Sequence, residues 1–329
     1  MAINIVQFTH PGGQYILSPK EQKTLIKEWN TGDHRRKFLI AKGQYVNNNV
    51  LSHIQDLLFW GEWEPTSKIL RTYSPFDPIL APTFLHSPFI TLNKKGLVVK
   101  NSSTLKTGLS KSCFGRVVPG CVITYNQFQN TDPFVFGNAF YYSCCKQEQF
   151  TSLRHLDVGS IILFGSTISS KHGGPYFALD TVFVVGEKRT YTAQTAQTDL
   201  AGFIPRYYDE IMGFNTWGTK TEFTCYKGAT FNNPVNGMYS FVPCKTAERG
   251  SCGFQRAKLT ASDFASVSIP DLSRYKKNPY VITDNLNSAP KRITSNIVAN
   301  KQVWDIICQV IASQDFLKGV NFDYDKTII

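Results

Sequence analysis

The sequence predicts an α+β fold, with a β-rich mixed sheet or barrel as the core, a few flanking helices and a C-terminal helix. Its middle part is rich in Val, Ile, Phe and Tyr, in short segments separated by Gly, Pro and Asn, which is typical of strands joined by turns. Residues 300–316 carry apolar side chains at helical spacing, which predicts the C-terminal helix. A hydrophobic content of 42% and a charged content of 18% indicate a folded globular protein.

In the N-terminal part, we expect short strands and one helix. Residues 4–10 alternate weakly between apolar and polar, which predicts a strand. Ser18, Pro19 and Glu21 are placed as an N-cap, a first helical residue and the closing residue of a capping box, so a helix should run from there to about Trp29. Further strands are expected at residues 37–41, 57–62 and 68–73.

After a proline-rich passage, the sequence predicts a long series of strands. A helix signal at residues 198–212 is interrupted by Pro205. Residues 226–230 and 236–244 form the two arms of a predicted hairpin, whose loop at 231–236 is placed to cover a pocket. The predicted strands are residues 89–92, 97–100, 117–128, 134–136, 140–144, 160–164, 177–185, 219–226 and 238–243.

We divide the chain into three parts. Residues 1–76 are expected to form an N-terminal α+β segment that packs on the core. Residues 77–272 are expected to form the β-rich core domain, and residues 273–329 a basic connection followed by the C-terminal helix. The stretch 273–293 is the expected loose connection, because neither a repeat nor a low-complexity linker occurs elsewhere.

The formal charge of +11 indicates a polyanionic partner. Residues 78–131 contain no Asp or Glu but six Lys or Arg residues. Positive charge segregated in this way attracts phosphates by direct contact and counterion release. Together with the aromatic content of 13%, it favours a nucleotide or nucleic acid as partner. The alternative is a solvated basic surface on an enzyme that acts on small molecules.

Other signals narrow the class of protein. No apolar run approaches the roughly 18 residues of a membrane span, and the N-terminus lacks the pattern of a secretion signal, so we expect a cytoplasmic protein with no membrane partner. The eight cysteines form no CxxC pair, which predicts reduced structural thiols and no metal site. The GxGxxG, P-loop, HExxH and GxSxG motifs are missing, so we expect no cofactor.

The densest set of ligand-binding residue types is FWGEWEP at residues 59–65. The ring faces of Trp60 and Trp63 are suited to stacking a planar base or a cation. The carboxylates of Glu62 and Glu64 can accept hydrogen bonds from a base edge. The alternative is a pair of core tryptophans on an ordinary strand.

A second set, DHRRK at residues 33–37, precedes the next apolar run. Arg35, Arg36 and Lys37 are candidates to hold phosphate, while Asp33 and His34 are candidates for acid–base catalysis. In the alternative interpretation, Asp33 is a turn residue and the charged run is a solvated entry to a strand.

Three isolated residues complete the candidate set. His10 stands beside a glycine-rich turn, either as a ligand contact or simply exposed. Asp132 either binds a ligand or shapes the turn before Pro133, and the turn role is favoured. Asp180 lies in an apolar strand, where a carboxylate is costly to bury unless it is paired, so it is a catalytic candidate. Cys244 is a possible nucleophile, but a single cysteine is usually inert packing.

GSIILFGS at residues 159–166, followed by FALDTVFVV at 177–185, resembles the nucleotide-modification-associated domains of bacteria and their phages. Those domains are similar to PUA and EVE modules, small β-barrels that hold an altered or flipped base in an aromatic cage. The resemblance covers the middle third, rests on the rhythm of strands and assigns no catalytic residue. It implies a role in antiviral defence or in handling modified nucleotides.

The sequence thus supports three hypotheses on function. The leading one is binding or processing of nucleotides or nucleic acid, possibly with a modified base, through an aromatic and acidic pocket with a basic rim. The second is a transferase or hydrolase that cleaves a nucleotide or N-glycosidic bond, in which Asp33, Glu62 or Asp180 stabilises an oxocarbenium-like centre and His34 moves a proton. The third is a protein-interaction module for an acidic partner, and no oligomeric state is predicted.

Overall fold

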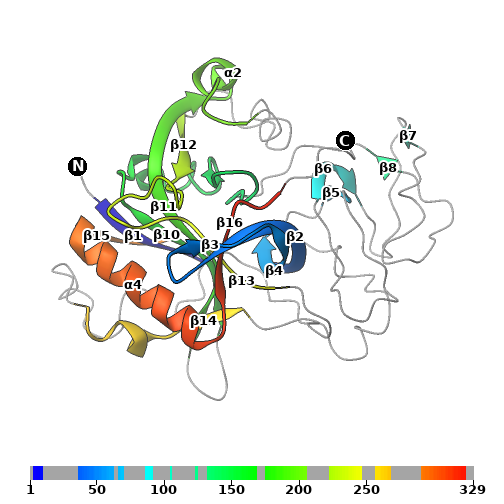
Figure 1. Ribbon diagram of the computed structural model, residues 1–329. Helices are drawn as coiled ribbons and strands as arrows, with labels where there is room; N and C mark the ends of the chain where they lie inside the picture. Colours follow the sequence, from blue (N-terminus) through cyan, green and yellow to red (C-terminus); the bar gives the residue numbers. More distant parts are fainter. Residues whose placement is uncertain are drawn as a thin grey trace.

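Two sheets of the chain pack together in the computed structural model (Figure 1). The structure describes residues 3–9, 36–62, 66–69, 86–91, 104–105, 123–124, 132–168, 175–205, 222–246, 256–267 and 290–323. Within these ranges, the predicted strand-rich α+β fold, with its barrel, mixed sheet and C-terminal helix, is confirmed.

The larger sheet has seven strands in the order β15-β1-β10-β11-β12-β9, with β14 paired to β11. Strands β1 and β10 run parallel, and the other pairs are antiparallel. The strands are β1 (Ile3–Thr9), β9 (Tyr141–Tyr142), β10 (Ile161–Ile168), β11 (Tyr176–Thr192), β12 (Glu222–Gly228), β14 (Ala257–Leu259) and β15 (Lys291–Ser295).

The smaller sheet closes into a barrel of four strands. Its order is β16-β13-β4-β2-β3, and β16 also pairs with β2, which completes the ring. The four strands of the ring are β2 (Arg36–Asn47), β4 (Gln55–Glu62), β13 (Val242–Thr246) and β16 (Leu317–Val320), and β3 (Val50–Leu51) pairs with β2 outside it. Two separate pairs are β5 (Thr66–Ile69) with β6 (His86–Thr91) and β7 (Thr104–Leu105) with β8 (Ile123–Thr124).

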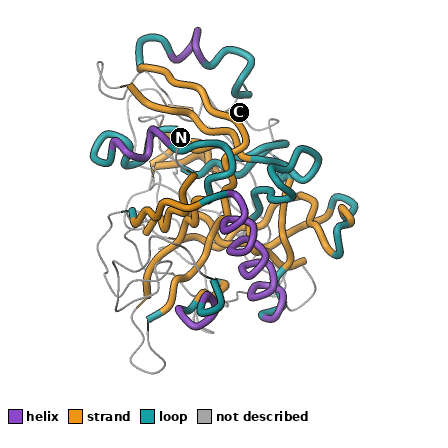
Figure 2. The backbone as a smooth tube through the Cα atoms, turned by 90° about the vertical axis from the view of Figure 1, so that its left-hand side faces the viewer, coloured by secondary structure: helices purple, strands orange, loops and turns teal. Residues whose placement is uncertain are grey.

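Helix α4 (Ile297–Ser313) covers one face of the larger sheet (Figure 2). It begins at Asn296, whose side chain accepts a hydrogen bond from the Ala299 N–H at 2.9 Å. Val303, Ile307 and Ile311 are buried against the sheet, as the helical spacing of the sequence predicted. The other helical segments are α2 (Ala196–Asp199) and the 3₁₀ turns η2 (Thr151–His155) and η4 (Ala261–Phe264).

The opposite face of the sheet packs against the barrel through aromatic side chains. Phe322, which follows β16, is fully buried, and its ring centre lies 4.4 Å from that of Phe59 on β4. A Cβ on Gly319 would lie 2.6 Å from the Phe322 ring, and a Cβ on Gly43 would lie 3.0 Å from it. Phe322 therefore fits between three barrel strands because two of them present glycine to its ring.

Most predicted elements lie where the sequence placed them. The strand at 4–10 is β1, that at 57–62 is β4, and that at 177–185 is the first half of the much longer β11. The predicted helix at 198–212 is wrong for the described residues 200–205, which form turns after the short α2. The helix predicted at 18–29 lies outside the described residues.

Each of the two sheets contains strands from all three predicted parts of the chain. The larger sheet takes β1 from residues 1–76 and β15 from residues 273–329, while the barrel combines β4, β13 and β16. The two predicted boundaries lie outside the described residues. Residues 291–293, which we expected in a loose connection, are part of β15 and pair with β1.

We predict that Gly319→Ala destabilises the fold by about 1–3 kcal/mol, the usual cost of overpacking a core. The new methyl group would lie 2.6 Å from Phe322 Cζ and 2.9 Å from Cys244 Sγ. Urea denaturation measures the loss. In a Phe322→Leu background, which removes Cζ, the additional loss from Gly319→Ala should be smaller, and an equal loss in both backgrounds contradicts this packing.

Candidate functional site

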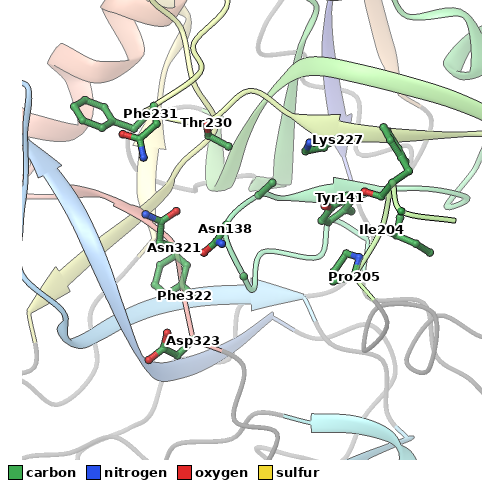
Figure 3. Close-up of a pocket in the computed structure, with 15 residues that line it drawn as sticks. Asn138, Tyr141, Ile204, Pro205, Lys227, Thr230, Phe231, Asn321, Phe322 and Asp323 are labelled. Atoms are coloured by element: carbon green, nitrogen blue, oxygen red, sulfur yellow. Dashed lines mark hydrogen bonds between the residues drawn. The ribbon is translucent and has the colours of Figure 1, made fainter. Parts of the chain in front are cut away.

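A cavity of about 850 Å³ opens where the barrel meets the larger sheet (Figure 3). Four segments of the chain form its walls, and they are far apart in the sequence. Its lining consists of Gly137, Asn138, Ala139, Tyr141, Gly202, Phe203, Ile204, Pro205, Lys227, Thr230, Phe231, Asn232, Asn321, Phe322 and Asp323. The volume is in the range of small-molecule binding sites, which is about 300–1,000 Å³.

Backbone hydrogen bonds fix the segment that follows β16 as one wall of the cavity. The Gly137 N–H donates to the Phe322 carbonyl at 2.7 Å, which ties this segment to the loop before β9. The Asp323 N–H donates to the Lys42 carbonyl at 2.7 Å, which ties it to β2 of the barrel. The wall is thus attached to both sheets.

The polar side chains of the cavity include three amides and one carboxylate, that of the exposed Asp323. Asn138, Asn232 and Asn321 line it together with Thr230, and each amide offers both donors and an acceptor. Apolar surface comes mainly from the partly exposed Phe231, Ile204 and Pro205, because the other aromatic rings of the lining are buried. The lining thus combines hydrogen-bonding groups with a smaller apolar surface, an arrangement that can bind a planar polar ligand.

The single lysine of the lining is paired. Lys227 Nζ donates to Glu187 Oε1 at 2.8 Å, across neighbouring positions of β11 and β12. Glu187 follows a bulge at Gly186, where an added Cβ would lie 2.7 Å from the Ala229 nitrogen. Both partners are partly exposed, so the pair contributes little stability, but it reduces the positive charge that the cavity presents.

The structure places Trp60 in the core and not on an open surface. Its side chain is 3% exposed and belongs to the same hydrophobic cluster as Leu57, Leu58 and Phe59. The expected role of Trp60 as an open stacking platform is therefore wrong for this structure. Phe59 contacts Phe322, so this strand supports the cavity from behind.

Of the other candidates at residues 33–37 and 59–65, the structure describes only some. Arg36 and Glu62 are direct cross-strand partners at the ends of β2 and β4, and Lys37 is opposite Gly61. Only the backbone of Arg36, Lys37 and Glu62 is described. The remaining candidates lie outside the described residues and stay predictions: His10, Asp33, His34, Arg35, Trp63 and Glu64.

Asp132 is buried and has a structural role, but its carboxylate binds the backbone of residues 143–145 and not the turn before Pro133 that the sequence analysis favoured. Its carboxylate accepts hydrogen bonds from three consecutive N–H groups, of Ser143 at 3.1 Å and of Cys144 and Cys145 at 2.8 Å each. Burial raises the pKa of Asp132, and these hydrogen bonds oppose the rise. The carboxylate is thus committed to the backbone that follows β9 and not to a ligand.

Asp180 is buried and paired with an arginine. The Arg256 guanidinium contacts both Asp180 oxygens, at 3.0 and 3.2 Å, and donates to Ser166 Oγ at 3.2 Å. The side chains of Arg256 and Asp180 are 0% and 3% exposed. The pairing that a carboxylate in an apolar strand requires is therefore present, and it joins β11 to β14, so Asp180 acts in the structure and lacks the access that a catalytic residue needs.

The buried thiols are also poorly suited to catalysis. Burial raises the pKa of the Cys144, Cys225 and Cys244 thiols far above their ordinary value, and that of Cys308 to about 12. A thiol reacts as its thiolate, so these groups are unreactive near neutral pH. Among the described residues, no three His, Cys, Asp or Glu side chains gather in a possible metal site.

No helix in the described part of the chain has the length and apolar character needed to cross a bilayer. Comparisons with protein-family models, with curated proteins and with solved structures find no match to this chain.

The sequence analysis indicated part of the cavity and missed the rest. The predicted loop at 231–236 supplies Phe231 and Asn232 to the lining. Asn138 follows the Asx-rich turn that begins near Asp132, and it was not singled out. Asn321 adopts a positive φ of 52°, a conformation in which asparagine is enriched, and only this local signal could have indicated it.

Removing Arg256 should be far more damaging than removing an exposed cation. Arg256→Met leaves the Asp180 carboxylate buried without its partner, and we expect a loss of about 3–5 kcal/mol in urea denaturation. Lys42→Met, which breaks a surface pair with Asp56 at 4.0 Å, is the control and should cost less than about 1 kcal/mol. The double variant Asp180→Leu/Arg256→Met should recover part of the loss. If Arg256→Met loses no more stability than Lys42→Met, the buried pair does not stabilise the fold.

Proposed function

We propose that the protein binds a nucleotide or a nucleic-acid strand and that the cavity between the two sheets receives the base. The observation that carries this proposal is the lining: three asparagines, one threonine and several aromatic rings around about 850 Å³. Side-chain amides make paired hydrogen bonds to base edges, and the apolar surface accepts the ring faces. This cavity takes the place of the pocket that the sequence predicted around Trp60.

The charge distribution supports a division of labour between base and phosphate. The chain has 35 Lys and Arg residues, and the side chains of 13 of them are described. It has 24 Asp and Glu residues, and the side chains of 12 of them are described. Nearly all of the net charge of +11 therefore belongs to residues whose side chains are not described. In the proposal, that excess attracts the phosphates, while the cavity, whose lysine is paired and whose lining carries the carboxylate of Asp323, takes the uncharged base.

The resemblance of β10 and β11 to nucleotide-modification-associated domains adds the biological setting to the proposal. In that setting, the ligand carries a modified base, and the protein acts in the cytoplasm in defence against phages. The position of both strands at the centre of the larger sheet assigns them a structural role, with the cavity formed beside them.

Calorimetric titration with adenosine, cytidine, guanosine and uridine tests the proposal, and we expect at least one to bind. Asn138→Ala should weaken that affinity by about five- to tenfold, because the amide of this exposed residue points into the cavity (Figure 3). Asn47→Ala, at an exposed asparagine of β2, is the matched control and should bind normally. If no nucleoside binds at millimolar concentration, the proposal fails.

Removing the ion-pair partner of Lys227 should change how much a phosphate group contributes to ligand affinity. Glu187→Gln removes the partner that lies 2.8 Å from Lys227 Nζ. We expect the ratio of affinities for a nucleoside 5′-monophosphate and its nucleoside to rise about three- to tenfold at low salt and less at high salt.

The double variant Glu187→Gln/Lys227→Gln is the control for this experiment, because it removes the freed ammonium and should return the ratio to that of the unmodified protein. An unchanged ratio in Glu187→Gln places the phosphate away from Lys227, and it would contradict our assignment of this lysine to the edge of the ligand site.

A further inference from the structure

A chain of two hydrogen bonds holds the side-chain amide of Asn321 in one orientation. Asn321 Nδ2 donates to Gln44 Oε1 at 3.0 Å, and Gln44 Nε2 donates to the Ser52 carbonyl at 2.8 Å. A backbone carbonyl can only accept, so Gln44 must direct its NH₂ group toward Ser52 and its oxygen toward Asn321. Asn321 must then direct its own NH₂ group toward Gln44.

This orientation leaves Asn321 Oδ1 facing the cavity. Figure 3 shows the oxygen on the side of Asn138 and the nitrogen on the opposite side. Asn321 is partly buried in the wall, and within the described part of the chain its Oδ1 accepts no hydrogen bond. The cavity thus presents a fixed acceptor that a ligand can satisfy.

The backbone around Asn321 also holds this acceptor in place. Asn321 follows Gly319 and Val320 of β16, and it precedes Phe322, which is packed between the barrel strands. Its φ of 52° lies in the left-handed region, which asparagine tolerates better than most residues. The amide therefore has little freedom to turn away from the cavity.

We infer that Asn321 determines specificity, by selecting ligands that carry an amino group, such as the exocyclic amine of an adenine- or cytosine-type base. This inference rests on the proposed function. An amine has two N–H donors, one for Asn321 Oδ1 and a second for another acceptor of the lining, such as the amide of Asn138. A ligand with a carbonyl or with hydrogen at this position leaves the acceptor unpaired.

The test compares ligands that differ only in this amine. Adenosine is titrated against purine riboside, which lacks the 6-amino group, and cytidine against its 4-deamino analogue. For at least one of the two pairs, the unmodified protein should prefer the amine by roughly tenfold, the effect of one acceptor left unpaired in a partly dry site.

Two variants then separate the acceptor from the residue that orients it. Asn321→Gly tolerates the positive φ and removes the acceptor, so the preference for the amine should fall to within about twofold. Gln44→Met keeps Asn321 but lets its amide rotate, so the preference should fall to within about threefold. Gln302→Met, at an exposed glutamine of α4, is the control and should keep the full preference.

The outcomes distinguish this inference from the proposed function. Equal affinity of the unmodified protein for both members of each pair overturns the inference and leaves nucleoside binding intact. A preference that survives in Asn321→Gly overturns the assignment to Asn321, and one that survives in Gln44→Met overturns the orienting role of Gln44. If no nucleoside binds, the proposed function fails and this inference fails with it.

Discussion

The packing of one ring, that of Phe322, is the constraint on which the barrel and the cavity both depend. The ring fits only because Gly43 and Gly319 carry no side chain, and its backbone carbonyl accepts a hydrogen bond from Gly137 at 2.7 Å. The residues on either side of it, Asn321 and Asp323, line the cavity. Because core packing positions this wall, the site is largely formed before any ligand arrives, which lowers the entropic cost of binding.

Closure of the barrel explains why the aromatic strand at residues 59–60 was assigned the wrong role from sequence. A dense aromatic segment suits an open stacking surface and a core strand equally well. Strand β4 is one strand of the closed ring, and residues 57–60 are all buried in a cluster shared with the larger sheet, so alternation no longer distinguishes two faces. Closure of the barrel is a long-range event, and the local pattern does not encode it.

The fold class could be predicted because its signals are local. The helical spacing around Val303 and Ile307 indicated α4, and β-branched and aromatic runs indicated β10 and β11. Short strands such as β14 and β16 were missed, since three or four residues carry little pattern. The pairing of Asp180 with Arg256, which are 76 residues apart, and a cavity built from four segments depend on tertiary structure that sequence spacing does not reveal.

The contrast between buried charges and cavity amides is the strongest physical argument for a ligand site. The buried carboxylates of Asp132 and Asp180 are satisfied within the protein, by backbone N–H groups and by Arg256. At the cavity, the charged Lys227 is paired as well, while Asn321 presents an acceptor that no described residue uses. Water can satisfy such an acceptor at little cost in the free protein. A ligand that displaces this water must replace its hydrogen bond, so the wall can select among ligands of the same shape without attracting anions in general.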